Sequence, residues 1–312
     1  MDSEKIGNPG AFHATRSTSA ARTSDRVATG VLAAIVGVIL VALVATIGYI
    51  IVSGAGKLFD WHFLTSMPEQ FKEGGGIGPE IFNSFYLLVL TLLISLPISL
   101  GAAVFLTQYA PEGPVTSVAK TAIETLSSLP SIVVGLFGML VFVLNLGWGF
   151  SILSGALALT MFNIPILVRI IQQALEAVPR DQRDAALALG LTRWEACTQV
   201  LVPAAMPAIV TGVILSAGRV FGEAAALIYT AGQSAPALSW AAPITSLANP
   251  LNVMRPAETL AVHIWKINSE GVVPDLSAVS AGTAAVLMVS ILAFNLIARV
   301  VGRALQRRMT AE

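Results

Sequence analysis

Long apolar runs without charges, separated by short polar segments, dominate this sequence. About 20 consecutive apolar residues cross the hydrocarbon core of a membrane. Runs of sufficient length lie at 27–56, 81–111, 125–168, 203–231 and 276–298, and only 203–231 contains charged residues. The run 125–168 is long enough for two crossings, with the turn expected at 145–149, Asn-Leu-Gly-Trp-Gly. The pattern predicts an all-α polytopic membrane protein with six transmembrane helices.

The polar segments divide this membrane domain from its ends. The first 26 residues are mostly polar and precede an apolar run far longer than the core of a cleavable signal peptide. We therefore expect a disordered tail at 1–26, a six-helix membrane domain at 27–303 and a short tail at 304–312. A polar loop at 176–203 interrupts the domain between its fourth and fifth spans.

Composition agrees with a membrane protein and excludes an ordinary soluble domain. Hydrophobic residues make up 55% of the chain, charged residues 12%, and the mean hydropathy is +0.78. A single cysteine, Cys197, excludes a disulfide framework within the chain, and we expect it to serve packing.

The distribution of Lys and Arg predicts the orientation, because cytoplasmic loops carry an excess of both. Four lie in the segments expected outside, namely Lys57, Lys72, Arg255 and Lys266. Twelve lie in the segments expected inside, namely Lys5, Arg16, Arg22, Arg26, Lys120, Arg180, Arg183, Arg193, Arg299, Arg303, Arg307 and Arg308. Both termini and the 176–203 loop are therefore predicted to be cytoplasmic.

The polar loop has the local signals of two helices joined at a break. Pro179 suits the first turn of a helix. Gly190 supplies a left-handed stop. Thr192 and Glu195 form a capping box that starts the next helix. The sequence therefore predicts a compact two-helix projection on one membrane face.

The same loop resembles the cytoplasmic "EAA" loop of ABC-importer permeases, Glu-Ala-Ala-x3-Gly-x9-Ile-x-Leu-Pro. The matching positions here are Asp184, Ala185, Ala186, Gly190, Val200, Val202 and Pro203, with three conservative replacements. In that family the loop docks on an ATPase subunit, so the resemblance implies coupling to ATP hydrolysis. An ordinary amphipathic helix pair between two spans is the alternative.

Four further stretches resemble the A-type permease of the bacterial phosphate importer (PstA). They are GGGIGP at 74–79, LPSIVVG at 129–135, RVFGEA at 219–224 and PAETLAVHI at 256–264. The resemblance implies a type I ABC-importer permease fold in the bacterial cytoplasmic membrane. It also implies a second, homologous permease (PstC-like), an ATPase dimer (PstB-like), a phosphate-binding protein (PstS-like) and phosphate as substrate. Permeases for another oxyanion, sulfate or molybdate, share the EAA loop but not this combination.

Three charged residues inside the predicted spans are the candidates for the substrate path. Arg219 and Glu223 lie four residues apart in the fifth span, and Arg169 lies toward the cytoplasmic half of the fourth. Charges at such depth are costly and by default functional or tightly paired. Guanidinium groups offer forked donors to phosphate oxygens. Glu223 is expected to neutralise Arg219 between transport events; a purely structural Arg219–Glu223 pair is the alternative, as is an Arg169 that extends to the interface.

The sequence contains no catalytic or nucleotide-binding motif of its own. The glycines at 74–78 lack the lysine and hydroxyl of a P-loop and are expected to form a flexible turn, so ATP and Mg²⁺ are assigned to the partner ATPase. The three histidines, His13, His62 and His263, fall in the tail or in external segments, and no metal site is expected. An intramembrane enzyme is therefore disfavoured, and no nucleic-acid partner is expected.

Overall fold

The computed structural model describes residues 18–69, 71–234, 236–271 and 273–310, and these contain helices and irregular segments but no strand. Its contacts group the chain into two units, residues 1–49 and 50–312. Residues 1–17 of the predicted tail, and 311–312 of the predicted C-terminal tail, lie outside the described residues. This composition of elements agrees with the predicted all-α class.

The first unit is the greater part of one long helix, α1 (Thr18–Leu58). The large apolar side chains between Val27 and Val44 are exposed, as a lipid-facing span requires. The helix begins at Thr18, although the sequence analysis started the span at Val27. Polar residues with good helix propensity, such as Arg22, extend a helix beyond its apolar stretch at little cost.

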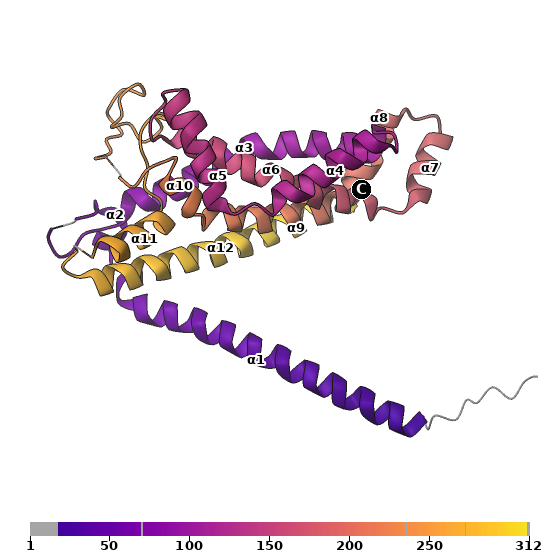
Figure 1. Cartoon of the computed structure of the whole chain (residues 1–312), viewed down its shortest axis with the longest axis horizontal. Coiled ribbons are helices and arrows are strands. Elements are labelled where there is room, and N and C mark those ends of the chain that lie inside the picture. Colours follow the sequence, from indigo (N-terminus) through magenta and orange to yellow (C-terminus); the bar gives the residue numbers. More distant parts are fainter. Residues whose placement is uncertain (1–17, 70, 235, 272, 311–312) are drawn as a thin grey trace, which may run out of the picture. The chain divides into compact units, whose positions relative to one another are not determined.

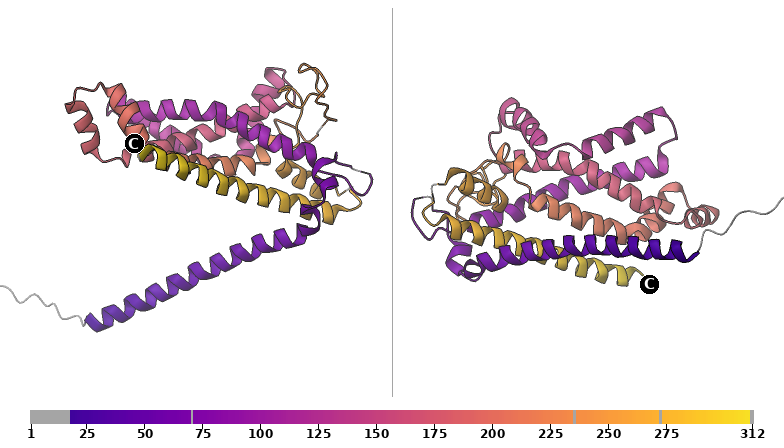
Figure 2. Two further views of the ribbon diagram at one scale, coloured as in Figure 1. Left: turned by 180° about the vertical axis from the view of Figure 1, so that it is seen from behind. Right: turned by 60° about the horizontal axis from the view of Figure 1, so that its bottom comes forward.

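The second unit is built on four long helices that lie side by side (Figures 1 and 2). Helix α3 packs on α6, α6 on α9, and α9 on α12. The long helices are α3 (Gly78–Val104), α6 (Ile152–Glu176), α9 (Val202–Phe221) and α12 (Leu276–Thr310). The shorter helices are α2 (Trp61–Thr65), α4 (Pro114–Ser127), α5 (Ser131–Gly138), α7 (Arg180–Ala188), α8 (Arg193–Ala196), α10 (Ala225–Ile228) and α11 (Leu260–Glu270).

Five helices of the described chain are long and apolar enough to cross a membrane, and a bent pair makes a sixth if it counts as one span. The pair joins α4 to α5 and its π-helical continuation η2 (Met139–Asn145) at an angle of 98°. The predicted third span, placed from Thr125 onward, is therefore not one straight helix. Pro130 explains the bend, because proline lacks an N–H and disfavours helical geometry at the residue before it.

Two spans also end at other residues than predicted. The helix that starts at Arg193 continues through a π-helical segment, η3 (Cys197–Leu201), into α9 and ends at Phe221, ten residues before the predicted end at Ala231. The second half of the polar loop is thus the first part of the fifth span and not a separate short helix. Helix α12 continues to Thr310, beyond the predicted limit at Ala298.

Small and polar side chains fix the helix packing. A Cβ added to Gly135 of α5 would lie 2.8 Å from the Cα atom of Ala226 in α10, so only glycine permits this approach. Asn163 of α6 donates to Ser95 Oγ of α3 at 3.0 Å and accepts from Ser216 Oγ of α9. This buried bridge links three of the four long helices.

The two ends of the second unit have different architectures (Figure 1). Helices α7 and α8 project at one end. At the other end lie helices α2 and α11 and the irregular segment 236–259 (Figures 1 and 2). The polar loop and the irregular segment, which the sequence analysis assigned to opposite membrane faces, are therefore separated by the length of the long helices.

Candidate functional site

The polar loop has the predicted local structure. Gly190 has a φ of +88°, which a residue with a Cβ rarely adopts, and it separates α7 from α8. Thr192 N donates to Glu195 Oε2 at 2.8 Å, and Glu195 N donates to Thr192 Oγ at 3.3 Å. The predicted break and capping box are confirmed. Pro179 immediately precedes α7 and does not lie inside it.

Some of the remaining motif residues of this loop are buried and others are exposed. Ala186 is buried, whereas Asp184 and Ala185 are exposed on α7. Pro203 lies in the first turn of α9, two residues after the end of the π-helical segment η3. As a proline it has no N–H to donate to the preceding turn. Leu189 and Trp194 are 84% and 61% exposed on the two sides of the break. Two exposed apolar side chains close together on a projecting loop are typical of a protein contact surface.

Arg219 lies near the end of α9 on a face that the chain itself does not cover. Its guanidinium carbon is 4.2 Å from the centre of the Phe162 ring on α6. Within the described residues no ion pair or hydrogen bond holds this guanidinium. The group is positioned by an aromatic face, and its N–H donors remain available.

The expected Arg219–Glu223 pair is wrong. Gly222 ends α9, so the i, i+4 geometry of a continuous helix does not reach Glu223. Glu223 Oε1 instead accepts from Ala226 N at 3.3 Å, at the start of α10. Arg219 and Glu223 therefore have separate partners.

Arg169 has a counterion that the sequence analysis did not consider. Its Nη1 lies 3.4 Å from Glu124 Oε1 of α4, and the side chains of Arg169 and Glu124 are 49% and 67% exposed. Phe162 and Arg169 are seven residues apart on α6 and hence on one face, separated by about 10 Å along the axis. Because Arg219 rests on Phe162, the two arginines follow one face of α6.

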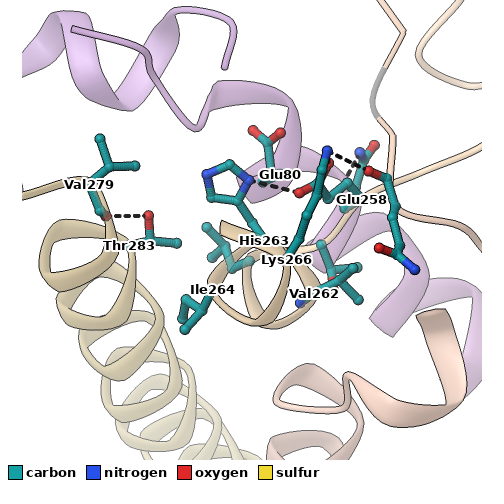
Figure 3. A network of polar contacts seen from close by, with 12 residues as sticks. Glu80, Glu258, Val262, His263, Ile264, Lys266, Val279 and Thr283 are labelled. Carbon is teal, nitrogen blue, oxygen red and sulfur yellow. Dashed lines mark hydrogen bonds and ion pairs between the residues drawn. The ribbon is translucent and has the colours of Figure 1, made fainter. Parts of the chain in front are cut away.

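The sequence analysis missed a buried charged cluster at the other end of the unit (Figure 3). His263 Nδ1 lies 2.8 Å from Glu258 Oε1, and Lys266 Nζ lies 3.1 Å from Glu258 Oε2. Glu80, at the start of α3, is wholly buried beside them. Two sequence signals lead to this cluster, because Glu80 directly follows GGGIGP, and Glu258 and His263 lie within PAETLAVHI.

The glycine-rich approach to α3 is tightly packed, in contrast to the flexible turn that the sequence suggested. Gly76 N donates to Met67 O at 2.9 Å, and Ile77 N donates to Phe63 O at 2.8 Å. A Cβ at Gly76 would lie 2.1 Å from Ser66 Oγ. These glycines allow the segment before α3 to pack against α2.

Arg255, which the sequence analysis counted only as an external charge, is a buried structural residue. Its Nη2 donates to Asn83 Oδ1 of α3 at 2.6 Å, and its Nε donates to Pro250 O at 3.1 Å. Asn83 Nδ2 in turn donates to Glu258 O at 2.8 Å. Burial lowers the pKa of Arg255 to about 10, so the side chain stays charged at neutral pH. The irregular segment is thereby fixed to α3.

Comparisons with known proteins give a family and a fold. A model of the family described as "Binding-protein-dependent transport system inner membrane component" matches residues 95–311. A probable ABC transporter permease of Bacillus subtilis, YqgI, is 47% identical over 93% of this chain and 99% of its own length. The phosphate transport system permease protein PstA 2 of Mycobacterium bovis is 36% identical over 59% of this chain and 60% of its own length.

Solved structures agree at the level of fold. A bacterial ABC transporter involved in the import of the acidic polysaccharide alginate has a chain that superimposes with a TM-score of 0.62, over 90% of this chain and 96% of that one. Their sequences are 15% identical, so the likeness concerns the fold alone.

Proposed function

Because the chain belongs to the binding-protein-dependent inner membrane components of ABC importers, we propose that it is the A-type permease of an ATP-driven phosphate importer. Its fold is that of type I importer permeases, and it is a multi-pass transport subunit and not an enzyme. Permeases of this family work with ATPase and substrate-binding partners. In our proposal these partners are a PstC-like second permease, a PstB-like ATPase dimer and a PstS-like phosphate-binding protein in a bacterial cytoplasmic membrane.

The state of Arg219 is the observation that carries the assignment of an oxyanion. An arginine in a membrane span is retained at considerable cost. This one is exposed, has no carboxylate partner among the described residues, and is oriented by the Phe162 ring. Its planar fork of N–H donors matches two oxygens of a tetrahedral anion. Similarity to phosphate permeases then favours phosphate over sulfate or molybdate.

The remaining charges suggest how phosphate would move. Arg169 lies about two helix turns from Phe162 on the same face of α6, and Glu124 partly neutralises it. An anion that leaves Arg219 would compete with Glu124 for Arg169, which limits how tightly the second site holds it. Glu223, two residues before α10, contributes a negative charge near the proposed path that disfavours retention of the anion. Arg219, Glu223 and Arg169 remain the proposed path residues.

The polar loop is proposed to contact the ATPase from the cytoplasm. Leu189 and Trp194 offer exposed apolar contacts, and Asp184 and Ala185 lie on the exposed face of α7. Ala186 and Pro203 would fix this surface to the membrane helices. Since α8 continues through η3 into α9, a displacement of the loop would act directly on the helix that bears Arg219.

Uptake by the complete importer in proteoliposomes tests the proposal. We expect ATP-dependent accumulation of labelled phosphate when the binding protein is present, and no accumulation of sulfate or molybdate. An importer that accumulates sulfate but not phosphate would refute the phosphate assignment and leave the family intact.

A further inference from the structure

The buried cluster around Glu258 has no role in the proposed transport path. It joins the start of α3, through Glu80, to the segment before α11 and to α11 itself, through Glu258, His263 and Lys266 (Figure 3). Relative exposure is 0% for Glu80, 1% for Glu258 and 4% for His263. Such groups need partners, because burying an unpaired charge is strongly unfavourable.

Some polar atoms of this cluster have partners, and others do not. Both oxygens of Glu258 are engaged, Oε1 with His263 Nδ1 and Oε2 with Lys266 Nζ. Lys266 Nζ also donates to Gln233 O at 2.7 Å. Within the described residues, both oxygens of Glu80 and Nε2 of His263 have no hydrogen-bond partner. Glu80 is therefore a buried carboxylate that no donor serves, close to Glu258 and His263.

We propose that Glu80, Glu258 and His263 form a binding site for one divalent transition-metal ion, Zn²⁺ or Mn²⁺. One potential ligand atom from each residue lies within 4.8 Å of the others. An ion with bonds of about 2.1 Å would draw these atoms together by roughly 1 Å. Two carboxylates and an imidazole are a donor set suited to these metals.

His263 Nδ1 and Glu258 Oε1 have the spacing of two ligands of one ion. They lie 2.8 Å apart, and two ligand atoms bonded to one ion at about 2.1 Å and roughly at right angles are about 3 Å apart. The ion would take the place of the proton that these two atoms otherwise share. Lys266 compensates one of the two carboxylates, so the four side chains carry a net charge of −1 with a neutral imidazole. A divalent cation supplies the missing positive charge beside Glu80.

An access route adjoins the site. A cavity of ≈ 210 Å³ is lined by His263 and Lys266 together with Glu69, Glu270 and the backbone region of Gly75 and Gly76. Its two additional carboxylates would attract a cation toward His263. Bound metal would then hold the glycine-rich turn, α3 and α11 together at the end of the unit opposite the polar loop.

Metal analysis of the full-length chain in detergent is the direct test. After removal of metals with a chelator, ZnCl₂ or MnCl₂ is added alone, and bound metal and thermal unfolding are measured. We expect one ion per chain and an unfolding midpoint several degrees higher with metal. X-ray absorption should show nitrogen and oxygen ligands at about 2.0–2.2 Å and no sulfur.

Three variants make the test specific. Glu80→Gln and His263→Gln should each weaken binding at least tenfold. Glu73→Gln removes an exposed carboxylate from the segment before α3, outside the cavity lining, and should bind like the parent chain. If one ligand variant does not fold, the other variant and the metal content of the parent chain still decide.

Three results would overturn the proposal. The first is a parent chain that binds no metal and shows no shift in unfolding. The second is an equal shift in Glu80→Gln, His263→Gln and the parent chain. The third is a parent chain that is equally stable with and without metal, together with a Glu80→Gln variant that is more stable than the parent chain. In that case a proton bound to Glu80, and not a metal ion, would be the missing partner.

Discussion

Arg219 and Arg255 are held in two different ways, and the difference separates a transport role from a structural one. Arg255 is fully buried, with its guanidinium satisfied by Asn83 and backbone carbonyls. Arg219 is exposed and rests on the Phe162 ring. A guanidinium with unused donors can bind an anion and release it, whereas one enclosed by acceptors cannot.

Replacing Arg219 by lysine should lower phosphate uptake by about tenfold, or ~1.4 kcal/mol. Lysine keeps the charge but loses the planar fork and stacks less well on Phe162. Labelled-phosphate uptake and subunit abundance are measured together. Arg299→Lys, at an exposed position of α12, is the matched control and should transport normally. Undiminished uptake by fully assembled Arg219→Lys would remove Arg219 from the path.

Replacing Arg255 by leucine should destabilise the chain by about 3 kcal/mol or more. The substitution removes the donors to Asn83 Oδ1 and Pro250 O and leaves these acceptors buried without a partner. Thermal unfolding in detergent measures the effect. Lys72→Leu removes an exposed charge from the same end and should change the midpoint little. Equal midpoints for both variants would show that Arg255 does not fix the irregular segment.

At the scale of elements, the polar loop depends on one backbone conformation. A Cβ at Gly190 would meet no atom within 4 Å, so any effect of substitution comes from its φ of +88°. Gly190→Val should cost ~1–2 kcal/mol at this turn, whereas Gly190→Asn should be tolerated, because asparagine adopts the left-handed region more readily.

We therefore expect Gly190→Val to insert and assemble but to lose coupling, with phosphate-stimulated ATP hydrolysis reduced several-fold. Gly190→Asn should retain most of the stimulation. The ATPase activity of both variants in the reconstituted importer is compared with phosphate and binding protein present and absent. Full stimulation in the valine variant would contradict a coupling role for the break.

Signals between neighbours in the sequence predicted helix starts and breaks correctly, but they could not predict contacts between residues far apart in the chain. The break at Gly190 and the Thr192–Glu195 box arise from neighbours in sequence, and both were predicted correctly. The predicted end of the fifth span was wrong. Apolar residues continue beyond Gly222, but the helix ends there. Glu80 and Glu258 are 178 positions apart, so their meeting depends on how α3 and α11 pack.

At the scale of the molecule, the second unit has two ends of different structure. The polar loop, proposed to meet the ATPase, lies at one end, and the charged cluster with the irregular segment lies at the other. The long helices between them carry Arg169 and Arg219. This order places the proposed substrate path between the proposed external surface and the coupling loop.

The arrangement makes a prediction about membrane sidedness that a single-cysteine chain can test. Cys197 is the only cysteine and is buried, so Cys197→Ala gives a background without reactive thiols. Trp240 and Leu189 are 69% and 84% exposed at opposite ends of the unit.

In that background, Trp240→Cys should react with a membrane-impermeant maleimide in intact spheroplasts, whereas Leu189→Cys should react only after lysis. The parent chain, with buried Cys197, should react slowly in both conditions. This result is predicted by the distribution of Lys and Arg, with twelve in the segments expected inside and four in the segments expected outside. Labelling of both cysteines in intact spheroplasts would mean that the helices between them cross the membrane differently.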